Sequence, residues 1–360
     1  MMDTVTLIYT CKERLTQANS PFSDFSKNDK GFTQAVLNGD ELCRECGLYY
    51  PTIRYCERPI GGGISGKTWE LAIEFSIPKL MCGNNLYEFD ETSLSDIAKT
   101  LHERLTEMEI HFISQADILE LYVRRMDPGK NILMNSRLGV DSVIRSISNA
   151  DVNRWLKFDK VNYENGGRLI RFHSKNEDIT FYDKSKELER QSVGNGAVAA
   201  TKFSGVLRFE IKMHGKRTIE RRMRGAGLTI PEEWEFQNLF KNEICHTLLS
   251  KRLKYIISNV PKIPLDEEEN VSGLLANIMT EESQNAGRGG VNKSLARFGL
   301  ICALKSGMNM RDIETMAEDG FGKGSLGQLK NIRGSPSHHQ LKNLLAVQKA
   351  VDEFRMLNPF

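Results

Sequence analysis

The stretch Val206–Met213 (VLRFEIKM) alternates between apolar and polar side chains. The apolar set comprises Leu207, Phe209, Ile211 and Met213, and the charged set between them comprises Arg208, Glu210 and Lys212. Successive side chains of an extended chain point to opposite faces, so a period of two is typical of a half-buried β-strand. The stretch therefore predicts a strand with one face in a core and one polar face.

Similar patterns extend outward from this strand. Period-two segments occur at Trp69–Ser76 (WELAIEFS), Asp117–Arg124 (DILELYVR), Leu169–His173 and Ile179–Lys184, the last two flanking a polar turn, SKNED. Between them, Ser93–Met108 repeats apolar residues every three or four positions, which predicts a helix. We expect an α+β fold: a mostly antiparallel sheet with helices on one face and a wet, chemically active opposite face.

A change of composition predicts a second domain. The segment Val260–Asn270 (VPKIPLDEEEN) combines two prolines with an acidic run, which is typical of a linker. Helical patterns follow at Lys293–Ser306, Met310–Glu318 and Leu341–Leu357. We predict a catalytic domain over 1–260, a linker over 261–271 and an all-helical domain over 272–360 that binds DNA or mediates self-association.

The composition excludes several classes of protein. Among 360 residues, 40% are hydrophobic and 27% charged, which is typical of an ordinary globular chain. No run approaches the roughly 20 apolar residues of a membrane-spanning helix, and no signal-peptide pattern opens the chain. Seven irregularly spaced cysteines favour a reducing cytosol. A net charge of +2 excludes a generally cationic protein but leaves room for local basic patches.

The octapeptide Gly61–Thr68 (GGGISGKT) matches the phosphate-binding P-loop pattern. That motif works only when a helix follows it and points its N-terminus at the phosphates. Here the following residues alternate with period two, so we interpret the segment as a glycine-rich turn entering a strand. Cys43 and Cys46 form half of a zinc pattern, but no second ligand pair lies nearby, so separate reduced cysteines are the favoured interpretation.

Acidic residues recur on the polar faces of the predicted strands. Glu74, Glu120 and Glu210 occupy such faces, and Tyr182 and Lys184 share another. If these strands are neighbours, carboxylates, a phenol and an ammonium group converge on one surface. Carboxylate clusters suit Mg²⁺ or Mn²⁺, which can stabilise charge on a phosphodiester. A solvated sheet face with ion pairs is the alternative.

Basic residues follow the strand at 206–213. The segment Lys212–Arg224 holds six Lys or Arg residues and a single acid. We predict that it forms a phosphate-contacting track, with a solvated helix face as the alternative. The predicted contacts are Arg208, Lys212, Lys216, Arg217, Arg221, Arg222 and Arg224.

At these residues the chain resembles the filamentous-phage replication initiation endonucleases, the phage/plasmid gene-two and gene-ten replication protein family. The matching elements occur in order along most of the chain. They are MMDTVTLIYT at the start; Lys79 with Gly83 and Asn85 before the helix; the acidic strand around Glu120; FYDKSKEL at Phe181–Leu188; GVLRFE at Gly205–Glu210; and, more weakly, Ser294–Ile332.

The resemblance implies rolling-circle replication initiation for a phage or plasmid. Such proteins bind a double-stranded origin, nick one strand through a tyrosine that becomes linked to the 5′ phosphate, and later rejoin the displaced single strand. The resemblance places the nucleophile at Tyr182, a basic partner at Lys184, and Mg²⁺ or Mn²⁺ ligands at Glu120 and Glu210. It further implies a bacterial host cytoplasm, host helicase and DNA polymerase as partners, and no membrane.

The residue types fit that chemistry. A tyrosine hydroxyl has a pKa of about 10, so attack on phosphorus requires an activator or a nearby cation. Lys184, two positions along a predicted strand, is expected on the same side as Tyr182. Two rival functions stay open: a conjugative relaxase or transposase with the same chemistry, and a non-catalytic DNA-binding regulator.

Overall fold

The structure is a computed structural model of the 360-residue chain. It describes residues 1–16, 20–29, 31–41, 47–59, 67–134, 137–150, 155–192, 205–260, 290–305 and 338–357, with short pieces at 152, 275, 278–280, 308, 312–313 and 315–316. The predicted linker at 261–271 lies outside these ranges, as do Cys43, Cys46 and most of the P-loop match.

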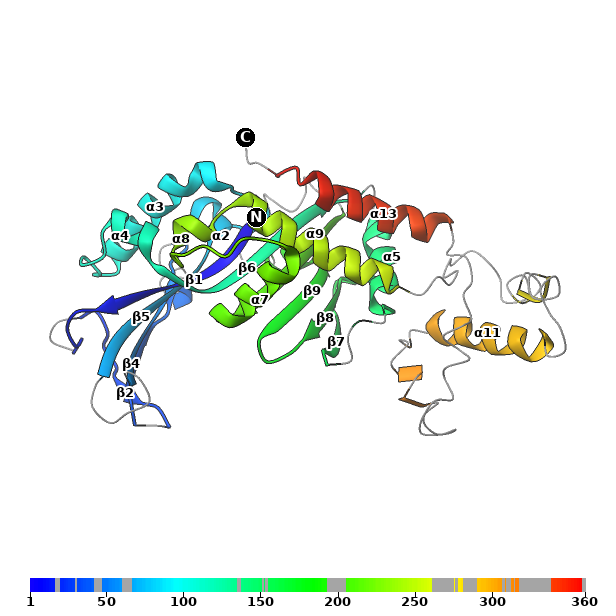
Figure 1. The fold of residues 1–360 in the computed structure, drawn as a ribbon, viewed down its shortest axis with the longest axis horizontal. Helices are drawn as coiled ribbons and strands as arrows, with labels where there is room; N and C mark the ends of the chain where they lie inside the picture. Colours follow the sequence, from blue (N-terminus) through cyan, green and yellow to red (C-terminus); the bar gives the residue numbers. More distant parts are fainter. Residues whose placement is uncertain are drawn as a thin grey trace.

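Ten strands of the described chain form one sheet in which every neighbouring pair is antiparallel (Figure 1). Their order across the sheet is β2-β3-β4-β5-β1-β6-β10-β9-β8-β7. The bounds are β1 Met2–Cys11, β2 Ser26–Lys27, β3 Thr33–Leu37, β4 Thr52–Pro59, β5 Lys67–Ser76, β6 Tyr122–Leu133, β7 Lys157–Asn162, β8 Arg168–His173, β9 Glu177–Asp183 and β10 Val206–His214. The predicted antiparallel α+β architecture is confirmed.

The period-two pattern of β10 produces the two faces that the sequence predicted. Leu207, Phe209 and Met213 are fully buried on the apolar face. Phe209 stacks there on Phe181 of the adjacent β9, with ring centroids 4.6 Å apart. Burial of each such side chain contributes about 1.5–3 kcal/mol, so this face adds substantially to the stability of the sheet.

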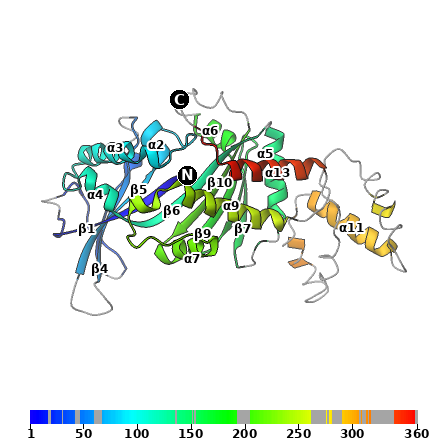
Figure 2. The ribbon, with the colours of Figure 1, turned by 45° about the horizontal axis from the view of Figure 1, so that its top comes forward.

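The described chain also contains helices, most of which pack against the sheet or against one another. The longer ones are α3 Leu94–Glu107, α5 Arg137–Ser148, α7 Lys216–Ala226, α9 Asn242–Ser258, α11 Gly290–Lys305 and α13 His338–Glu353. The shorter ones are α2 Ile77–Cys82, η1 Glu91–Ser93, α4 Gln115–Glu120, α6 Lys184–Ser192 and α8 Phe236–Leu239. In two views 45° apart, α7 and α9 lie in front of β6, β9 and β10 (Figures 1 and 2). They cover the apolar face, because Ile211 and Met213 line a pocket between them.

The predicted strand at 117–124 is wrong. Residues 115–120 form helix α4, and β6 begins only at Tyr122. A capping box explains the difference: the hydroxyl of Ser114 accepts the backbone N–H of Asp117, and the carboxylate of Asp117 accepts the N–H of Ser114. These local hydrogen bonds favour a helix over the extended form that the hydrophobic alternation indicated.

The predicted C-terminal domain is also wrong in part, because α13 joins the main body. Leu344, Val347 and Val351 belong to the same buried cluster as the sheet. Beyond α13, the carbonyl oxygen of Arg355 accepts a hydrogen bond from Lys130 of β6, at 2.5 Å. A helix that buries its apolar face on another unit is part of that unit's core, whatever its distance along the chain.

The glycine-rich match to the P-loop enters a strand. Lys67 and Thr68, its last two residues, open β5 instead of a helix. The helix N-terminus that would bind phosphate is therefore missing at this point of the described chain, as the sequence indicated. In the same described residues, every helix is too short or too polar to cross a membrane.

We expect Leu344→Ala to lower the free energy of unfolding of the main body by about 2–5 kcal/mol, since it removes a buried side chain of the shared core. Chemical denaturation followed by the fluorescence of Trp69 and Trp234 measures this value. The neighbouring Leu345 is 54% exposed, so Leu345→Ala is the matched control and should change it by less than about 0.5 kcal/mol. Equal effects of the two variants would place α13 outside the core.

Candidate active site

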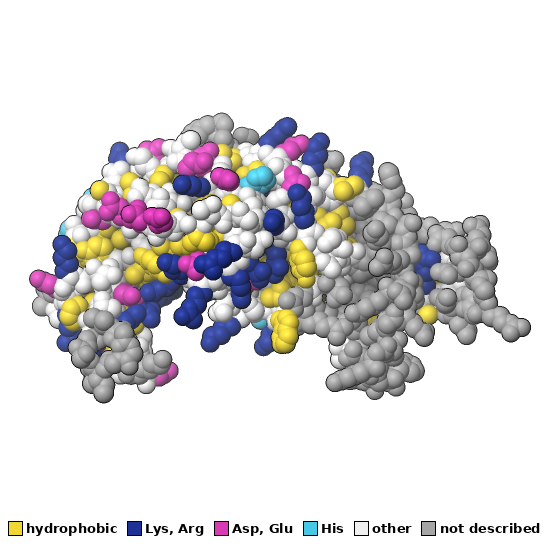
Figure 3. All heavy atoms as spheres, in the orientation of Figure 1, with side chains coloured by type: hydrophobic (Ala, Val, Ile, Leu, Met, Phe, Trp, Pro, Cys, Tyr) yellow, Lys and Arg dark blue, Asp and Glu magenta, His cyan; other side chains and the backbone are white. Residues whose placement is uncertain are grey.

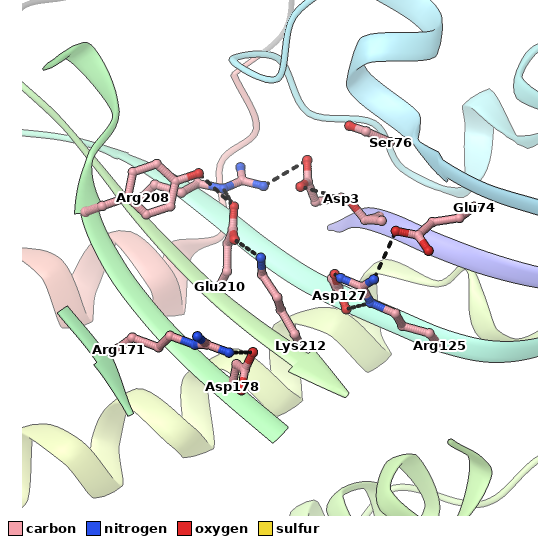
Figure 4. A network of polar contacts seen from close by, with 12 residues as sticks. Asp3, Glu74, Ser76, Arg125, Asp127, Arg171, Asp178, Arg208, Glu210 and Lys212 are labelled. Atoms are coloured by element: carbon pink, nitrogen blue, oxygen red, sulfur yellow. Dashed lines mark hydrogen bonds and ion pairs between the residues drawn. The ribbon is translucent and has the colours of Figure 1, made fainter. Parts of the chain in front are cut away.

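The polar faces of the central strands meet in one network (Figure 4). Arg208 and Glu210 of β10 lie opposite Tyr182 and Thr180 of β9. On the other side, Glu210 lies opposite Gly129 of β6. The predicted convergence of Glu210 and Tyr182 therefore occurs. The centre of this face is buried, however, since Glu210 is 5% exposed and Arg208 is fully buried. The prediction that this face is wet is wrong at its centre.

Tyr182 points into this network and not into the apolar core. Its hydroxyl donates a hydrogen bond to Oε1 of Glu210 at 2.9 Å. Burial and the neighbouring Glu210 raise the pKa of Tyr182 well above its usual value, although Arg208 opposes the shift. The phenol is therefore protonated at neutral pH, and the carboxylate of Glu210 accepts its hydrogen bond.

Arg208 connects three strands through its guanidinium group. Nε donates to the same oxygen of Glu210 at 2.9 Å, and Nη2 lies 3.0 Å from the carboxylate of Asp3 on β1. The group passes over Gly129, where an added Cβ would lie 2.6 Å from Nη2. Burial alone would raise the pKa of Glu210, but Arg208 and Lys212 outweigh it and lower that pKa. The predicted DNA contact at Arg208 is therefore wrong, because its side chain is enclosed by protein.

Lys184 lies beside Tyr182, although not on a strand. It is the first residue of α6, and its Nζ sits 5.6 Å from the centre of the Tyr182 ring. Nζ also lies 2.5 Å from the carboxylate of Glu187. Burial lowers the pKa of Lys184, while Glu187 raises it. The predicted proximity of the two side chains holds, with the strand ending one residue earlier than expected.

Glu120 does not reach this network. It is the last residue of α4, outside the sheet. Gly129, the partner of Glu210, lies seven positions along β6 from Tyr122, which corresponds to about 23 Å of extended chain. The predicted pair of metal ligands, Glu120 and Glu210, is therefore not formed.

The described residues do not fit a Mg²⁺ or Mn²⁺ site. No group of three possible ligands among His, Cys, Asp and Glu occurs in this part of the chain. The carboxylates of the polar face are bound instead by arginines: Glu210 and Asp3 by Arg208, and Asp127 by Arg125. A divalent ion would have to displace a guanidinium group from each of them.

A second acidic cluster lies beside the first, and the sequence analysis missed it. Arg125 of β6 binds Asp127 through two nitrogens, at 3.0 and 2.6 Å, and Glu74 of β5 at 3.1 Å (Figure 4). Burial raises the pKa of Asp127 to about 7, although Arg125 opposes the shift. Its sequence context, MDPGK, resembles a turn, and only the pairing of β6 with β10 shows that it is a strand.

The motif around Lys79, Gly83 and Asn85 closes a helix. Gly83 has a φ of 70°, a left-handed conformation that glycine adopts without strain, and its N–H bonds to the carbonyl oxygen of Lys79. The chain then turns so that the backbone oxygen of Asn85 accepts a bond from Asn131 of β6 at 3.4 Å. These residues position the loop that borders the network.

The predicted basic track divides between the two sides of the sheet. Lys212 lies on the polar face, 3.9 Å from Glu210. The remaining residues lie on α7, which packs on the apolar side with α9. Figure 3 shows dark blue side chains gathered over this region of the helical side. The α7 residues are Lys216, Arg217, Arg221, Arg222 and Arg224.

Residues 1–237 match the family described as the N-terminal region of the gene-two replication-associated protein. The chain belongs to this family. Neither a curated protein nor a solved structure matches it. The predicted resemblance to the filamentous-phage gene-two replication proteins is thereby confirmed. Membership in the gene-two family supports a phage rolling-circle replication initiator that acts on origin DNA.

The region matched by the gene-two family contains the whole polar network, from Asp3 to Glu210, and ends just before α9.

The titration of Asp127 in this network gives a testable pH dependence. The carboxyl of Asp127 has a pKa of about 7 in the folded state and about 3.8 in the unfolded state. Between these two pH values, folding is therefore accompanied by the binding of a proton to Asp127. Stability is therefore greatest below about pH 4 as far as this group is concerned, and falls as the pH rises toward 7.

We expect Asp127→Asn to reduce this fall in the free energy of unfolding between pH 4 and pH 8, by at most about 1.4 kcal/mol per pH unit. Urea denaturation at a series of pH values measures it. Asp159→Asn, which changes a half-exposed carboxylate on the edge strand β7, is the matched control. Identical pH profiles for wild type and Asp127→Asn would mean that Asp127 does not titrate in this range.

Proposed function

We propose that this member of the gene-two family nicks one strand of a double-stranded replication origin through Tyr182 and later rejoins the displaced strand. The observation that carries the proposal is the 2.9 Å hydrogen bond from the Tyr182 hydroxyl to Glu210. It pairs a nucleophile with a carboxylate acceptor, and Arg208 holds that carboxylate in place. This arrangement, nucleophile, base and orienting group, is the general pattern of nucleophilic catalysis.

In the proposed step, the proton of Tyr182 passes to Glu210 while the phenolate oxygen attacks the scissile phosphorus. A new O–P bond joins Tyr182 to the 5′ phosphate, and the bond to the 3′ oxygen breaks. The released 3′ oxygen takes up a proton and can prime a host polymerase. Rejoining is the reverse attack by a 3′ hydroxyl on the phosphotyrosine, so it requires no ATP.

Two lysines can stabilise charge during this reaction. Lys184 lies over the Tyr182 ring, and Lys212, whose side chain is 36% exposed, lies beside Glu210 and can contact the phosphate. Tyr182 itself is only 8% exposed. The proposal therefore includes an opening of the polar face when DNA binds, and the strand that enters must be locally single-stranded. Supercoiled DNA, which unpairs more readily, is the expected substrate.

We also propose that nicking requires Mg²⁺ or Mn²⁺. This part of the proposal depends on the family resemblance alone, because the described carboxylates do not form a metal site. Nicking assays with and without either ion, and with a chelator, test it. Host helicase and polymerase are likewise proposed partners. A conjugative relaxase or transposase would cut at a transfer origin or element end, and a DNA-binding regulator would form no covalent adduct.

We expect Tyr182→Phe to abolish both nicking of supercoiled origin DNA and the covalent protein–DNA adduct, because the attacking oxygen is lost. Gel analysis of the nicked DNA and of labelled protein measures both. Tyr122→Phe is the matched control: Tyr122 lies on β6 and is 38% exposed, far along the strand from Glu210. If the Tyr182→Phe protein still forms the adduct, a residue other than Tyr182 is the nucleophile.

We expect Glu210→Gln to slow nicking by about 10²–10⁴-fold, the usual contribution of a general base, while DNA binding is retained. Single-turnover nicking rates measured against pH check this, since loss of the base should also flatten the profile. Glu74→Gln, on the same face but bound to Arg54 and Arg125, is the control. An equal loss in both variants would assign Glu210 a structural role.

A further inference from the structure

A pocket of about 240 Å³ lies on the side of the sheet opposite to Tyr182. Helices α7 and α9 form its walls, and the apolar face of β10 forms its floor through Ile211 and Met213. The chemistry proposed for the polar face does not use it. The charge of the segment Lys212–Arg224 pointed to the basic residues of α7 but gave no reason to expect a cavity beside them.

Four cationic side chains line this pocket, against a single carboxylate. Arg221 and Arg222 come from α7, and Lys251 and Arg252 come from α9. Glu177 of β9, 2% exposed, forms ion pairs with Arg222 and with Arg252, the latter at 3.6 Å. The net charge of the pocket is therefore strongly positive, and the exposed Arg221 and Lys251 border its mouth.

Two arginines of the pocket, Arg222 and Arg252, have N–H donors without a hydrogen-bond partner in the described part of the chain. The Nε atoms of Arg222 and Arg252 are buried and have no hydrogen-bond partner among the described residues. A buried donor without a partner costs about 1–3 kcal/mol. A phosphate group, which accepts several N–H bonds at once, would satisfy both and neutralise the excess charge. Burial and Arg222 lower the pKa of Arg252, although Glu177 opposes the shift.

The pocket also offers surfaces for a base. Tyr255 lines it, and the guanidinium group of Arg252 lies over the Tyr255 ring, 5.2 Å from its centre. Leu248 and the two β10 side chains supply apolar contact. Sites for single-stranded nucleic acid usually combine cationic side chains with an aromatic ring. The cations contact the phosphates, and a base stacks on the ring. Duplex DNA keeps its bases inside and could reach only the rim.

We propose that the α7–α9 pocket binds one nucleotide of single-stranded DNA, with its phosphate at Arg222 and Arg252 and its base against Tyr255. The proposal rests on the proposed function only in its choice of DNA as the nucleic acid. The site lies across the sheet from Tyr182, so a strand released by nicking can be held there while the 5′ end stays attached on the other face.

The test uses the full-length protein and a fluorescent oligothymidine, with binding followed by anisotropy. The paired change Arg221→Glu with Lys251→Glu avoids the buried ion pairs of Glu177, so folding should be retained. Arg221 and Lys251 at the mouth would contact the phosphates on either side of the bound nucleotide, so we expect affinity to fall at least about tenfold and the slope of log K against log salt to decrease by roughly 1.4, about 0.7 for each of these two contacts. Lys99→Glu with Lys241→Glu makes the same charge change at two exposed lysines outside both the pocket and the predicted basic track, and should change affinity much less.

Tyr255→Ala separates a nucleotide pocket from a simple basic patch. We expect it to weaken oligothymidine binding by about 5- to 150-fold and to leave duplex binding unchanged. Equal loss for single-stranded and duplex DNA, or equal effects of the pocket and control pairs, would overturn the proposal. Tyr182→Phe should bind oligothymidine normally, so loss of nicking and loss of this site are distinguishable.

Discussion

The buried guanidinium of Arg208 is the interaction on which the centre of this protein depends. It holds Asp3 of β1 and Glu210 of β10, and it does so across Gly129 of β6, where a larger residue would exclude it. Removal of one partner of such a buried pair generally costs about 3–5 kcal/mol, because the remaining charge is left without compensation. The same contact fixes the carboxylate that receives the hydrogen bond of Tyr182.

In this arrangement, one face of the sheet carries the apolar core and the other face carries the polar network. The side chains of β10 that face α7 and α9, such as Phe209 and Met213, are apolar and fully buried. Those on the opposite face form charged networks that reach from Glu74 to Asp178 (Figure 4). Because alternate residues of each strand serve the two faces, the same strands build both the apolar core and the polar network. The basic helix α7 lies on the apolar side, so the protein carries cationic side chains on both sides of the sheet.

Much of the site was predictable from the sequence, and the exceptions have physical reasons. Tyr182 and Glu210 were paired correctly because both occupy polar positions of strongly alternating strands. Glu120 was misplaced because DILELYVR alternates as a strand does, while the capping box of Ser114 and Asp117 favours a helix there. Arg208 was expected to contact DNA, since charge in a sequence does not reveal whether a carboxylate from a distant strand encloses it.

The antiparallel α+β class, the strand faces and the family could be inferred from the amino-acid pattern alone, because these depend on local periodicity and on short ordered motifs. Which side chains meet became clear only from the folded chain. Asp3 joins Arg208 across more than two hundred residues, α13 returns to the core of the sheet, and α7 folds to the opposite side from Lys212. Such contacts arise from strand order and helix packing, which no local pattern encodes, and they also set the burial that shifts the pKa values of Tyr182 and Asp127.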